Sequence, residues 1–378
     1  MIFSTDPLHI ALLSVFLLMA AIQAWYYLRY YRKAANVPRD EKTDGTDLPP
    51  LSVIICARNE AANLKIFLPF VLDQDYPLFE VVVVNDCSED ETHELLEDMM
   101  LHYPHLRVST IQKDPGFTHA KKLAMLIGIK AASHDLLAFT DADCRPVSDK
   151  WLRHIAAAYS GRPDIVLGYG GYFPEKGLLN RYIRYETMFI ATQYMGMGLA
   201  GVPYMGVGRN LAYSRTYFFA KGGFGPHYHI ISGDDDLFVN RNATAKNCSM
   251  MLAPESFTRS VAPLTAESWI RQKRRHFSTA KYYKFSDRVR LFLEPFSRII
   301  YYGLLTALLI ILASWPVVAF IAMARLVTRV VIIHKTCRTF NEPRLWFISL
   351  FFDILSPFVS TALYLTGTRK GKRTQTWK

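Results

Sequence analysis

The segment Phe139-Thr140-Asp141-Ala142-Asp143-Cys144 carries two carboxylates one residue apart, directly after the apolar residues 136–139. A buried strand has little structural reason to end in two acidic residues. Carboxylate oxygens are the ligands that hard divalent cations prefer, and Mg²⁺ commonly binds one or two carboxylates together with substrate phosphates. The spacing therefore indicates a site for a divalent cation and a phosphorylated ligand. The alternative is a solvated strand end, and the rest of the sequence decides between the two.

Short apolar runs alternate with helix-like segments around this motif. The patterns predict strands over 51–56, 80–84, 107–111 and 135–140, and helices over 60–72, 88–100 and 120–132. The Ser88-x-x-Glu91 spacing has the form of a capping box at the start of the second helix. Strands separated by helices of this length predict an α/β domain with a mostly parallel sheet.

Ligands of such sheets bind beyond the carboxyl ends of the strands. Four acidic residues follow these ends, namely Glu60, Asp86, Asp141 and Asp143. Like charges at one edge repel each other unless a cation or a hydrogen-bonding ligand lies between them. Since the first strand is followed by no Gly-x-Gly-x-x-Gly or Walker-type loop, a dinucleotide or P-loop site is not expected.

Six motifs between residues 51 and 280 occur in the order found in glycosyltransferase family 2, which this sequence resembles. In chain order they are residues 53–60 (Val-Ile-Ile-Cys-Ala-Arg-Asn-Glu), residues 85–92 with Asn85-Asp86, Lys121-Lys122, Asp141-Ala142-Asp143, residues 233–237 (Gly-Asp-Asp-Asp-Leu) and residues 272–276 (Gln-Lys-Arg-Arg-His). The resemblance implies a metal-assisted inverting enzyme with the GT-A fold that uses a nucleotide-diphospho-sugar donor.

The resemblance also implies roles for the donor side. Asp86 binds the nucleoside, and Asp141 binds the ribose or the metal. Asp143 holds Mg²⁺ or Mn²⁺ on the diphosphate, where the ion stabilises the charge that grows on the leaving group. Lys121 supports this region or, equally, is a solvated lysine on a helix face.

Direct inversion needs a base that takes the proton of the acceptor hydroxyl, and Asp234, Asp235 and Asp236 precede the apolar Leu237. Clustered carboxylates raise at least one pKa, which suits a base. Counting back from Leu237 as in the family motif selects Asp234, and counting forward from Gly233 selects Asp235. Both stay open, and Asp236 is read as favourable charge at a helix start.

On the acceptor side, Gln272, Arg275 and His276 have the spacing of one helix face. They resemble the family's Gln-x-x-Arg-Trp motif, in which Arg275 pairs with the diphosphate. His276 stands where the family usually has Trp, which puts acceptor stacking and a long polymer track in doubt. Asn210 is a candidate for acceptor binding, with a structural turn as the alternative.

Two uncharged stretches, 7–28 and 299–324, are each long enough to cross a bilayer as a helix. The first is read as a retained anchor rather than a signal peptide, because Asp6 stands before it and no cleavage site follows. Arg29, Arg32 and Lys33 after it place the following domain in the cytoplasm by the positive-inside rule. For the second, a hairpin of two short helices over 299–333, with 345–366 re-entrant or interfacial, is favoured over a single span at 299–324 followed by a returning span at 345–366.

We therefore expect four parts: a membrane anchor at 1–33, a linker at 34–50, a GT-A domain at 51–285, and interfacial and transmembrane helices with a basic tail at 286–378. The expected location is the inner (plasma) membrane, multi-pass, with the catalytic domain in the cytoplasm. The net charge of +11 suits anionic lipid or anionic substrates. Because no recognition motif accompanies it, nucleic acid is not an expected partner.

The expected function is transfer of a sugar to a lipid-linked or glycan acceptor. A processive polysaccharide synthase is the alternative within the enzyme class. Two other classes are a transporter, disfavoured by the uncharged stretch 299–324, and a catalytically silent sugar-nucleotide sensor or scaffold, disfavoured because every acidic position is filled.

Overall fold

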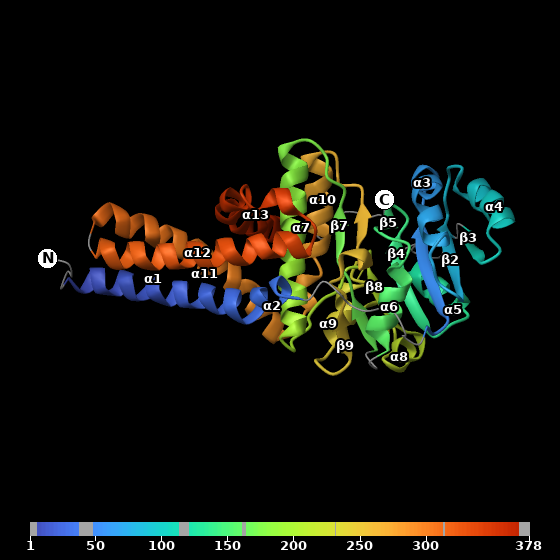
Figure 1. Cartoon of the computed structure of the whole chain (residues 1–378), viewed down its shortest axis with the longest axis horizontal. Helices are drawn as coiled ribbons and strands as arrows, with labels where there is room; N and C mark the ends of the chain where they lie inside the picture. Colours follow the sequence, from blue (N-terminus) through green and yellow to red (C-terminus); the bar gives the residue numbers. More distant parts are fainter. Residues whose placement is uncertain are drawn as a thin grey trace.

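The computed structural model describes residues 6–37, 48–112, 121–160, 164–230, 232–312 and 314–369. Figure 1 shows an elongated molecule with three parts in a row. The long helices α1 (Pro7–Tyr26), α11 (Phe285–Ile311) and α12 (Trp315–Thr339) form a stalk on the left. The α/β domain lies on the right, and α7 (Leu178–Leu199), α10 (Ala266–Phe277) and α13 (Ser349–Arg369) lie between the two. Most of the predicted linker and the basic tail from residue 370 lie outside the described residues.

A seven-stranded sheet with the order β3-β2-β1-β4-β8-β6-β9 forms the α/β domain. Its parallel half consists of β1 (Leu51–Ala57), β2 (Phe79–Asp86), β3 (Leu106–Ile111) and β4 (Leu136–Asp141). These are the four predicted strands, each within one residue of its predicted start. Beyond β4 the order continues with the antiparallel β8 (Leu211–Ser214), then β6 (Ile165–Leu167) and β9 (Cys248–Met250).

Both faces of the sheet are covered, which is why its strands are continuous apolar runs. Val53 and Ile55 of β1 pack with residues of α3 (Ala61–Leu72), α4 (Thr92–His102) and α6 (Trp151–Tyr159). Ile54 and Cys56 point the other way, into the cluster that contains α5 (Lys121–Ala131) and α8 (Arg215–Ala220). The helix α9 (Asp236–Asn242) adds Leu237 to that second cluster.

A second sheet of three short strands has the order β5-β10-β7. Its central strand β10 (Thr258–Ser260) runs antiparallel to β5 (Cys144–Pro146) and parallel to β7 (Gly170–Tyr172). Since β5 begins directly after Asp143, this sheet fixes the chain that leaves the Asp-x-Asp motif. Short 3-10 turns at Gly225–His227, Pro254–Ser256, Ala280–Tyr282 and Pro343–Leu345 connect the remaining elements.

The predicted capping box at Ser88 is wrong. The cap residue of α4 is Glu91, whose side chain makes no capping bond, and the Thr92 amide donates to Asp90 instead. The Ser88 hydroxyl accepts a hydrogen bond from the amide of Asn59, in the loop that follows β1. Residue 88 is thus used to join two strand-end loops, a contact that local spacing cannot reveal.

Among the described residues, four helices are long and apolar enough to cross a membrane: Pro7–Ala35, Phe285–Ile311 and Trp315–Thr339 of the stalk, and Ser349–Thr366 of α13. The first continues α1 through a π-helical turn (Tyr27–Tyr31) and α2 (Arg32–Ala35), two residues past the predicted anchor. The break between α11 and α12 falls before Pro316, as the hairpin alternative requires, although both helices are longer than expected.

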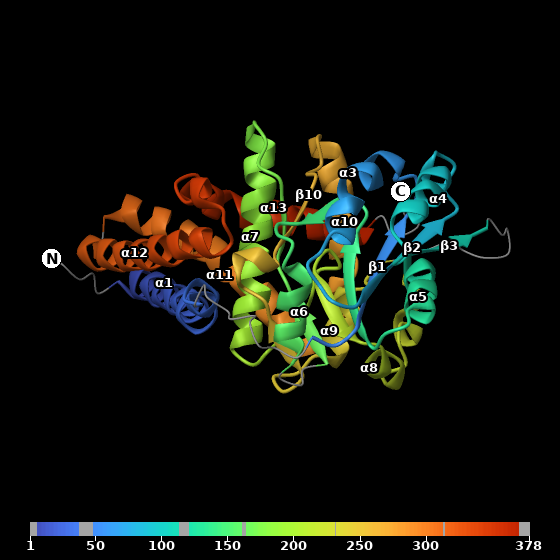
Figure 2. The same cartoon turned by 45° about the vertical axis from the view of Figure 1, so that its right-hand side comes forward.

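The helix α13 is oriented differently from the stalk. In Figure 1 it is seen nearly end-on while α1, α11 and α12 run along the molecule, and Figure 2 shows it extending behind α10. Several of its side chains are exposed and apolar, including Phe351 (59%) and Phe358 (48%). This direction fits the interfacial alternative for 345–366. Which side of a membrane each helix end faces stays a prediction.

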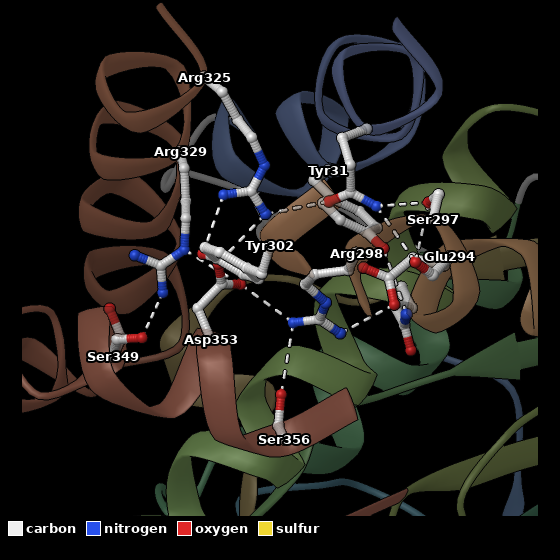
Figure 3. A network of polar contacts seen from close by, with 12 residues as sticks. Tyr31, Glu294, Ser297, Arg298, Tyr302, Arg325, Arg329, Ser349, Asp353 and Ser356 are labelled. Atoms are coloured by element: carbon white, nitrogen blue, oxygen red, sulfur yellow. Dashed lines mark hydrogen bonds and ion pairs between the residues drawn. The ribbon is translucent and has the colours of Figure 1, made fainter. Parts of the chain in front are cut away.

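Charged side chains buried between the helices hold α13 to the stalk (Figure 3). The carboxylate of Asp353 on α13 lies 3.0 Å from Arg298 on α11 and 3.2 Å from both Arg325 and Arg329 on α12. Arg298 also pairs with Glu294 at 2.9 Å. These side chains are at most 7% exposed. Because isolated charges are costly away from water, the arrangement makes the helices depend on one another.

Replacing Asp353 by Asn should therefore destabilise the protein strongly. The change leaves three buried guanidinium groups with Glu294 as their remaining carboxylate, a loss worth about 3–5 kcal/mol for a broken buried pair. The midpoint of thermal unfolding of the full chain in detergent measures it. Asp75→Asn is the matched control, because Asp75 pairs with Arg153 on the surface and is 58% exposed. An equal, small effect of both changes would contradict a structural role of the buried network.

Candidate functional site

The parallel strands bring two predicted site residues to one edge of the sheet. Asp86 is the last residue of β2 and Asp141 the last residue of β4, and β1 lies between them. In the register of the sheet, Cys56 of β1 stands beside Val84 on one side and Asp141 on the other. Two strand spacings, about 10 Å, therefore separate Val84 from Asp141. Asp86 lies two residues beyond Val84 along β2, so Asp86 and Asp141 end strands at the same edge with β1 between them.

The loop after β1 is bound to the loop after β2. The amides of Asn59, Glu60 and Ala61 donate to side chains of Ser88, Thr92 and Asp90, respectively. Asn59 has a φ of 54°, a left-handed conformation that Asn adopts more readily than most residues. The carboxylate of Glu60 is buried and accepts a hydrogen bond from Asn63 at 2.6 Å. Glu60 therefore stands at the expected edge, with its side chain directed toward the first turn of α3.

Lys121 lies between carboxylates from two distant parts of the chain. Its Nζ is 2.7 Å from Asp141 and 3.7 Å from Asp234. Burial by itself lowers the pKa of Lys121 and raises that of Asp141, but the combined attraction of their neighbours, including Asp234 for Lys121 and Arg209 for Asp141, is stronger. The pKa of Lys121 is consequently raised well above its usual value, and that of Asp141 is lowered. Both groups are charged at neutral pH.

The neighbouring Lys122 positions the acidic trio 234–236. It is buried, and its ammonium donates to the carbonyl oxygens of His227 and Ile230 at 2.8 and 2.6 Å. Both carbonyls belong to the chain that leads to the trio. Consecutive lysines at the start of α5 therefore have different tasks: Lys121 contacts the acidic side chains, and Lys122 holds the backbone that carries them.

Asp143 stands beside Asp141 and Cys144 in a cluster whose potential ligand atoms lie within 4.8 Å of one another. Burial and the negative charge of Asp141 raise the pKa of Asp143. Burial and Asp143 also raise the pKa of the Cys144 thiol well above its usual value, so the sulfur stays protonated. The donors available at neutral pH are therefore carboxylate oxygens, which suit a hard cation such as Mg²⁺ or Mn²⁺.

The three consecutive aspartates have different environments. Asp235 caps α9: its two carboxylate oxygens accept from the amides of Asp236 and Gly208, both at 2.7 Å. Asp236 accepts from the hydroxyls of Thr279 and Tyr283 at 2.5 and 2.7 Å. Asp234 instead directs an oxygen toward Lys121. Two of the three are thus engaged in holding backbone or neighbouring helices.

Burial and the charges of Asp234 and Asp236 raise the pKa of Asp235 to about 7. The pKa of Asp236 is raised as well, chiefly by burial. The trio therefore takes up a proton close to neutral pH. A cluster of this kind titrates as a unit, and its proton affinity depends on the positive charge nearby.

One side of α10 is docked on α7. Trp269 and Lys273 both bind Glu186 of α7, at 3.3 and 2.8 Å. Gln272 and His276 follow Trp269 by three and seven residues and therefore lie along the same side of the helix, whereas Arg275 lies on the adjoining side. Gln272 accepts a hydrogen bond of 3.4 Å from the hydroxyl of Tyr172.

The side chains of Arg275 and His276 are linked to shifted pKa values. The positive charge of Arg275 contributes to the lowered pKa of Asp141, which places it near the end of β4. Solvent reaches the ring of His276, yet the surrounding protein atoms and the charges of Lys273 and Arg275 lower its pKa well below the usual value. The imidazole is therefore neutral at pH 7.

The prediction that Asn210 binds the acceptor is wrong. Its side chain is fully buried, and its amide group donates to the carbonyl oxygens of Tyr169 and Ser256 at 3.0 and 2.8 Å. Its oxygen accepts from the indole of Trp151 at 3.0 Å. With every donor used inside the protein, Asn210 is a structural residue of the turn into β8.

Sequence reasoning missed the residue before it. The guanidinium of Arg209 lies over the ring of Tyr172, 4.3 Å from its centroid, and is near enough to Asp141 and Asp143 to affect both pKa values. Its Nη1 is buried and has no hydrogen-bond partner among the described residues. The available signal was an arginine within a Gly-x-Gly-Arg turn of a chain whose other strand ends are acidic.

Elements far apart in the sequence thus bring most predicted residues to one edge. Asp141, Asp143, Lys121, Asp234, Arg209 and Arg275 influence one another, and the pKa of Cys56 responds to Asp86 as well as to Asp141 and Asp234. Asn210 does not belong to this set. The arrangement can bind an anionic ligand with a cation and can hold a proton acceptor beside it.

Comparisons with known proteins agree with this arrangement. Residues 52–219 match the family model for glycosyl transferase family 2. Glycosyltransferase AglE of Haloferax volcanii is 35% identical over 116 residues, which are 30% of this chain and 36% of AglE. Probable glycosyltransferase YdaM of Bacillus subtilis is 26% identical over 267 residues, or 66% of this chain and 59% of YdaM. The matched part covers less than two thirds of either relative.

A solved structure shares the whole architecture. Mannosyltransferase PcManGT from Pyrobaculum calidifontis, in complex with GDP-Man and Mn²⁺, aligns with a TM-score of 0.61 over 96% of this chain and 99% of its own, at 17% identity. At this identity the likeness concerns the fold. The strand order, the carboxylates at the strand ends and the family match agree, and residues 52–219 are therefore a glycosyl transferase family 2 domain with the GT-A fold.

Proposed function

We propose that this protein is a membrane-anchored inverting glycosyltransferase that moves a sugar from a nucleotide-diphospho-sugar to a hydroxyl of a lipid-linked or glycan acceptor. The observation that carries the proposal is the position of Lys121 between Asp141 and Asp234. It joins the carboxylates after β4, which suit a diphosphate with its cation, to those before α9, which suit a base. Direct displacement needs these two functions on opposite sides of one sugar.

The donor is bound by groups from three strand ends. Asp86 accepts hydrogen bonds from the nucleoside, and Asp141 from the ribose. Arg209 and Arg275 face the negative phosphates, for which a guanidinium fork is well shaped. The buried, unpartnered Nη1 of Arg209 supports this role, since a buried guanidinium nitrogen without a partner is costly unless a ligand supplies one.

Asp143 fits a divalent cation, because its pKa is raised beside Asp141 and a cation would relieve that repulsion. When bound, Mg²⁺ or Mn²⁺ supplies Lewis-acid stabilisation of the charge on the departing diphosphate. PcManGT was solved with a nucleotide sugar and Mn²⁺, and we carry over those two ligand classes. We propose neither a particular sugar nor a particular nucleobase for the donor.

Asp234 is the proposed base. It takes the proton of the acceptor hydroxyl as that oxygen forms a bond to the anomeric carbon. The bond from this carbon to the phosphate oxygen breaks, and its electron pair leaves with the nucleoside diphosphate. Asp235 is a positioning residue in this proposal, because its oxygens hold Gly208 and the start of α9.

The acceptor is proposed to reach the site from the membrane side. The helix α10, which carries Gln272 and His276, lies with α7 and α13 between the stalk and the α/β domain (Figure 1). A lipid-linked acceptor held in this plane would search for the site in two dimensions. Three basic residues near the end of the first long helix, Arg29, Arg32 and Lys33, support an anchor in the inner membrane with the α/β domain on the cytoplasmic side.

The metal role is tested by Asp143→Asn. Loss of this carboxylate should lower metal-dependent transfer by about a hundredfold or more, since a Lewis acid contributes several kcal/mol to the barrier. Turnover of a panel of nucleotide sugars with Mg²⁺ and with Mn²⁺ measures it. Asp149→Asn, an exposed aspartate six residues later, is the matched control. Unchanged turnover in Asp143→Asn, with normal unfolding, would remove Asp143 from the site.

The choice of base is tested by comparing two neighbouring substitutions. Asp234→Asn should lower kcat by about 10²–10⁴-fold, the usual contribution of a general base, with little change in KM for the donor. Asp235→Asn should lower it less, because an amide oxygen still accepts a backbone hydrogen bond. The reverse order of effects would make Asp235 the base.

The pH profile gives an independent measurement. Since burial and its neighbours raise the pKa of Asp235 to about 7, a proton enters the trio below that pH, and kcat/KM should fall on the acid side with a midpoint near 7. Lys121 lowers this pKa, so Lys121→Gln should move the midpoint to higher pH. Lys130→Gln removes the same charge at the exposed end of α5 and should leave it in place. A midpoint that does not respond to Lys121 would contradict the electrostatic coupling.

Arg209 is tested by Arg209→Gln. Loss of a charge-assisted contact to phosphate should raise KM for the donor or lower kcat/KM by about tenfold or more. Arg241→Gln, an exposed arginine on α9, should leave both constants unchanged. Equal kinetics for the two variants would show that Arg209 only neutralises the acidic edge.

A further inference from the structure

A hollow on the membrane-facing layer lies apart from the residues assigned to transfer. It has a volume of about 490 Å³ and is lined by Arg181 of α7 and Arg344 of the turn after α12, together with Phe347, Ile348, Leu350 and Phe351 at the start of α13. Two guanidinium groups thus share a small space with apolar side chains.

Both arginines are available for a ligand. Arg181 and Arg344 are exposed, and neither has an ion-pair or hydrogen-bond partner among the residues that the structure describes. The apolar part is equally open, with Phe347 at 70% and Phe351 at 59% exposure. Free cations beside exposed aromatic rings are unusual on a surface that faces only water.

The surrounding structure fixes the distance between the two arginines. Arg184, one turn after Arg181 on α7, pairs with Glu342, which stands two residues before Arg344 and is fully buried. Tyr182 packs against Phe352 of α13 with ring centroids 5.0 Å apart. The hollow is therefore preformed, which lowers the entropic cost of binding.

We propose that this hollow binds the phosphate headgroup of an anionic membrane phospholipid. The guanidinium pair matches a phosphate, and the phenylalanines match the adjoining acyl chains. The position supports a lipid of the bilayer, because the lining residues come from the turn after α12 and the start of α13. In Figures 1 and 2, α12 is part of the stalk and α13 lies across its inner end. The proposal does not depend on the transfer reaction.

The test is binding of fluorescent phosphatidylglycerol to the full chain in neutral detergent, with phosphatidylcholine as the reference lipid. We expect phosphatidylglycerol to bind about tenfold or more tightly than phosphatidylcholine, and Arg181→Gln/Arg344→Gln to abolish that preference. The control Lys65→Gln/Lys130→Gln removes the same charge from α3 and α5 and should retain it. Unchanged unfolding midpoints confirm that each variant is folded.

Two outcomes would overturn the proposal. One is a preference for phosphatidylglycerol that survives in Arg181→Gln/Arg344→Gln or disappears in both double variants, since the effect would then come from overall charge. The other is competition by free glycerol 3-phosphate as effective as that by phosphatidylglycerol, which would indicate a site for soluble phosphate. Neither measurement involves sugar transfer, so a failure here leaves the proposed activity untouched.

Discussion

The ammonium of Lys121 lies between the carboxylate of Asp141, within the family domain, and that of Asp234, which follows the end of this domain in the sequence. Parallel strands end at one edge, and here that edge carries acidic residues from β2, β4 and the loop before α9. Their repulsion would oppose folding if no cation were present. Lys121 offsets it for Asp141 and Asp234, while Asp143 and Asp235 keep raised pKa values. A cation bound with the donor would neutralise negative charge beside Asp143, and a proton from the acceptor would neutralise it in the trio that contains Asp235.

Buried charges connect this edge to the stalk. Glu342, at the end of the hairpin, binds Arg184 of α7 and Arg259 of β10. The strand β10 pairs with β5, which begins directly after Asp143, and with β7, which ends at Tyr172 beneath Arg209. The distance between the proposed metal ligand and the membrane layer is thus set by a chain of paired elements rather than by a flexible linker.

The sequence predicts those parts of the molecule whose signal is local. Alternating apolar runs locate β1 to β4 and the helices between them, because a sheet covered on both faces needs uninterrupted apolar strands. Asp86, Asp141 and Asp143 follow from strand ends. Non-local contacts were not predictable. The Ser88 hydroxyl accepts a hydrogen bond from the loop after β1, and the side chain of Asn210 is fully hydrogen-bonded to Trp151 and two backbone carbonyls. Arg209 was missed because its guanidinium is positioned by contact with the ring of Tyr172, a residue of another sheet.

The contacts of α10 connect the helices α7 and α13 to the candidate site. Trp269 and Lys273 fasten the helix to Glu186, and Tyr182 contacts both Trp269 and Phe352. A displacement of α13 relative to α7 would therefore shift the surface on which α10 packs, and with it the positions of Gln272, Arg275 and His276. Arg181 of α7 and Arg344 of the turn before α13 line the same hollow, so a phosphate bound to both would connect α7 to the start of α13. If the proposed lipid binds there, the position of Gln272, Arg275 and His276 depends on the protein together with that lipid, which is a reason to study the protein in a bilayer of defined charge.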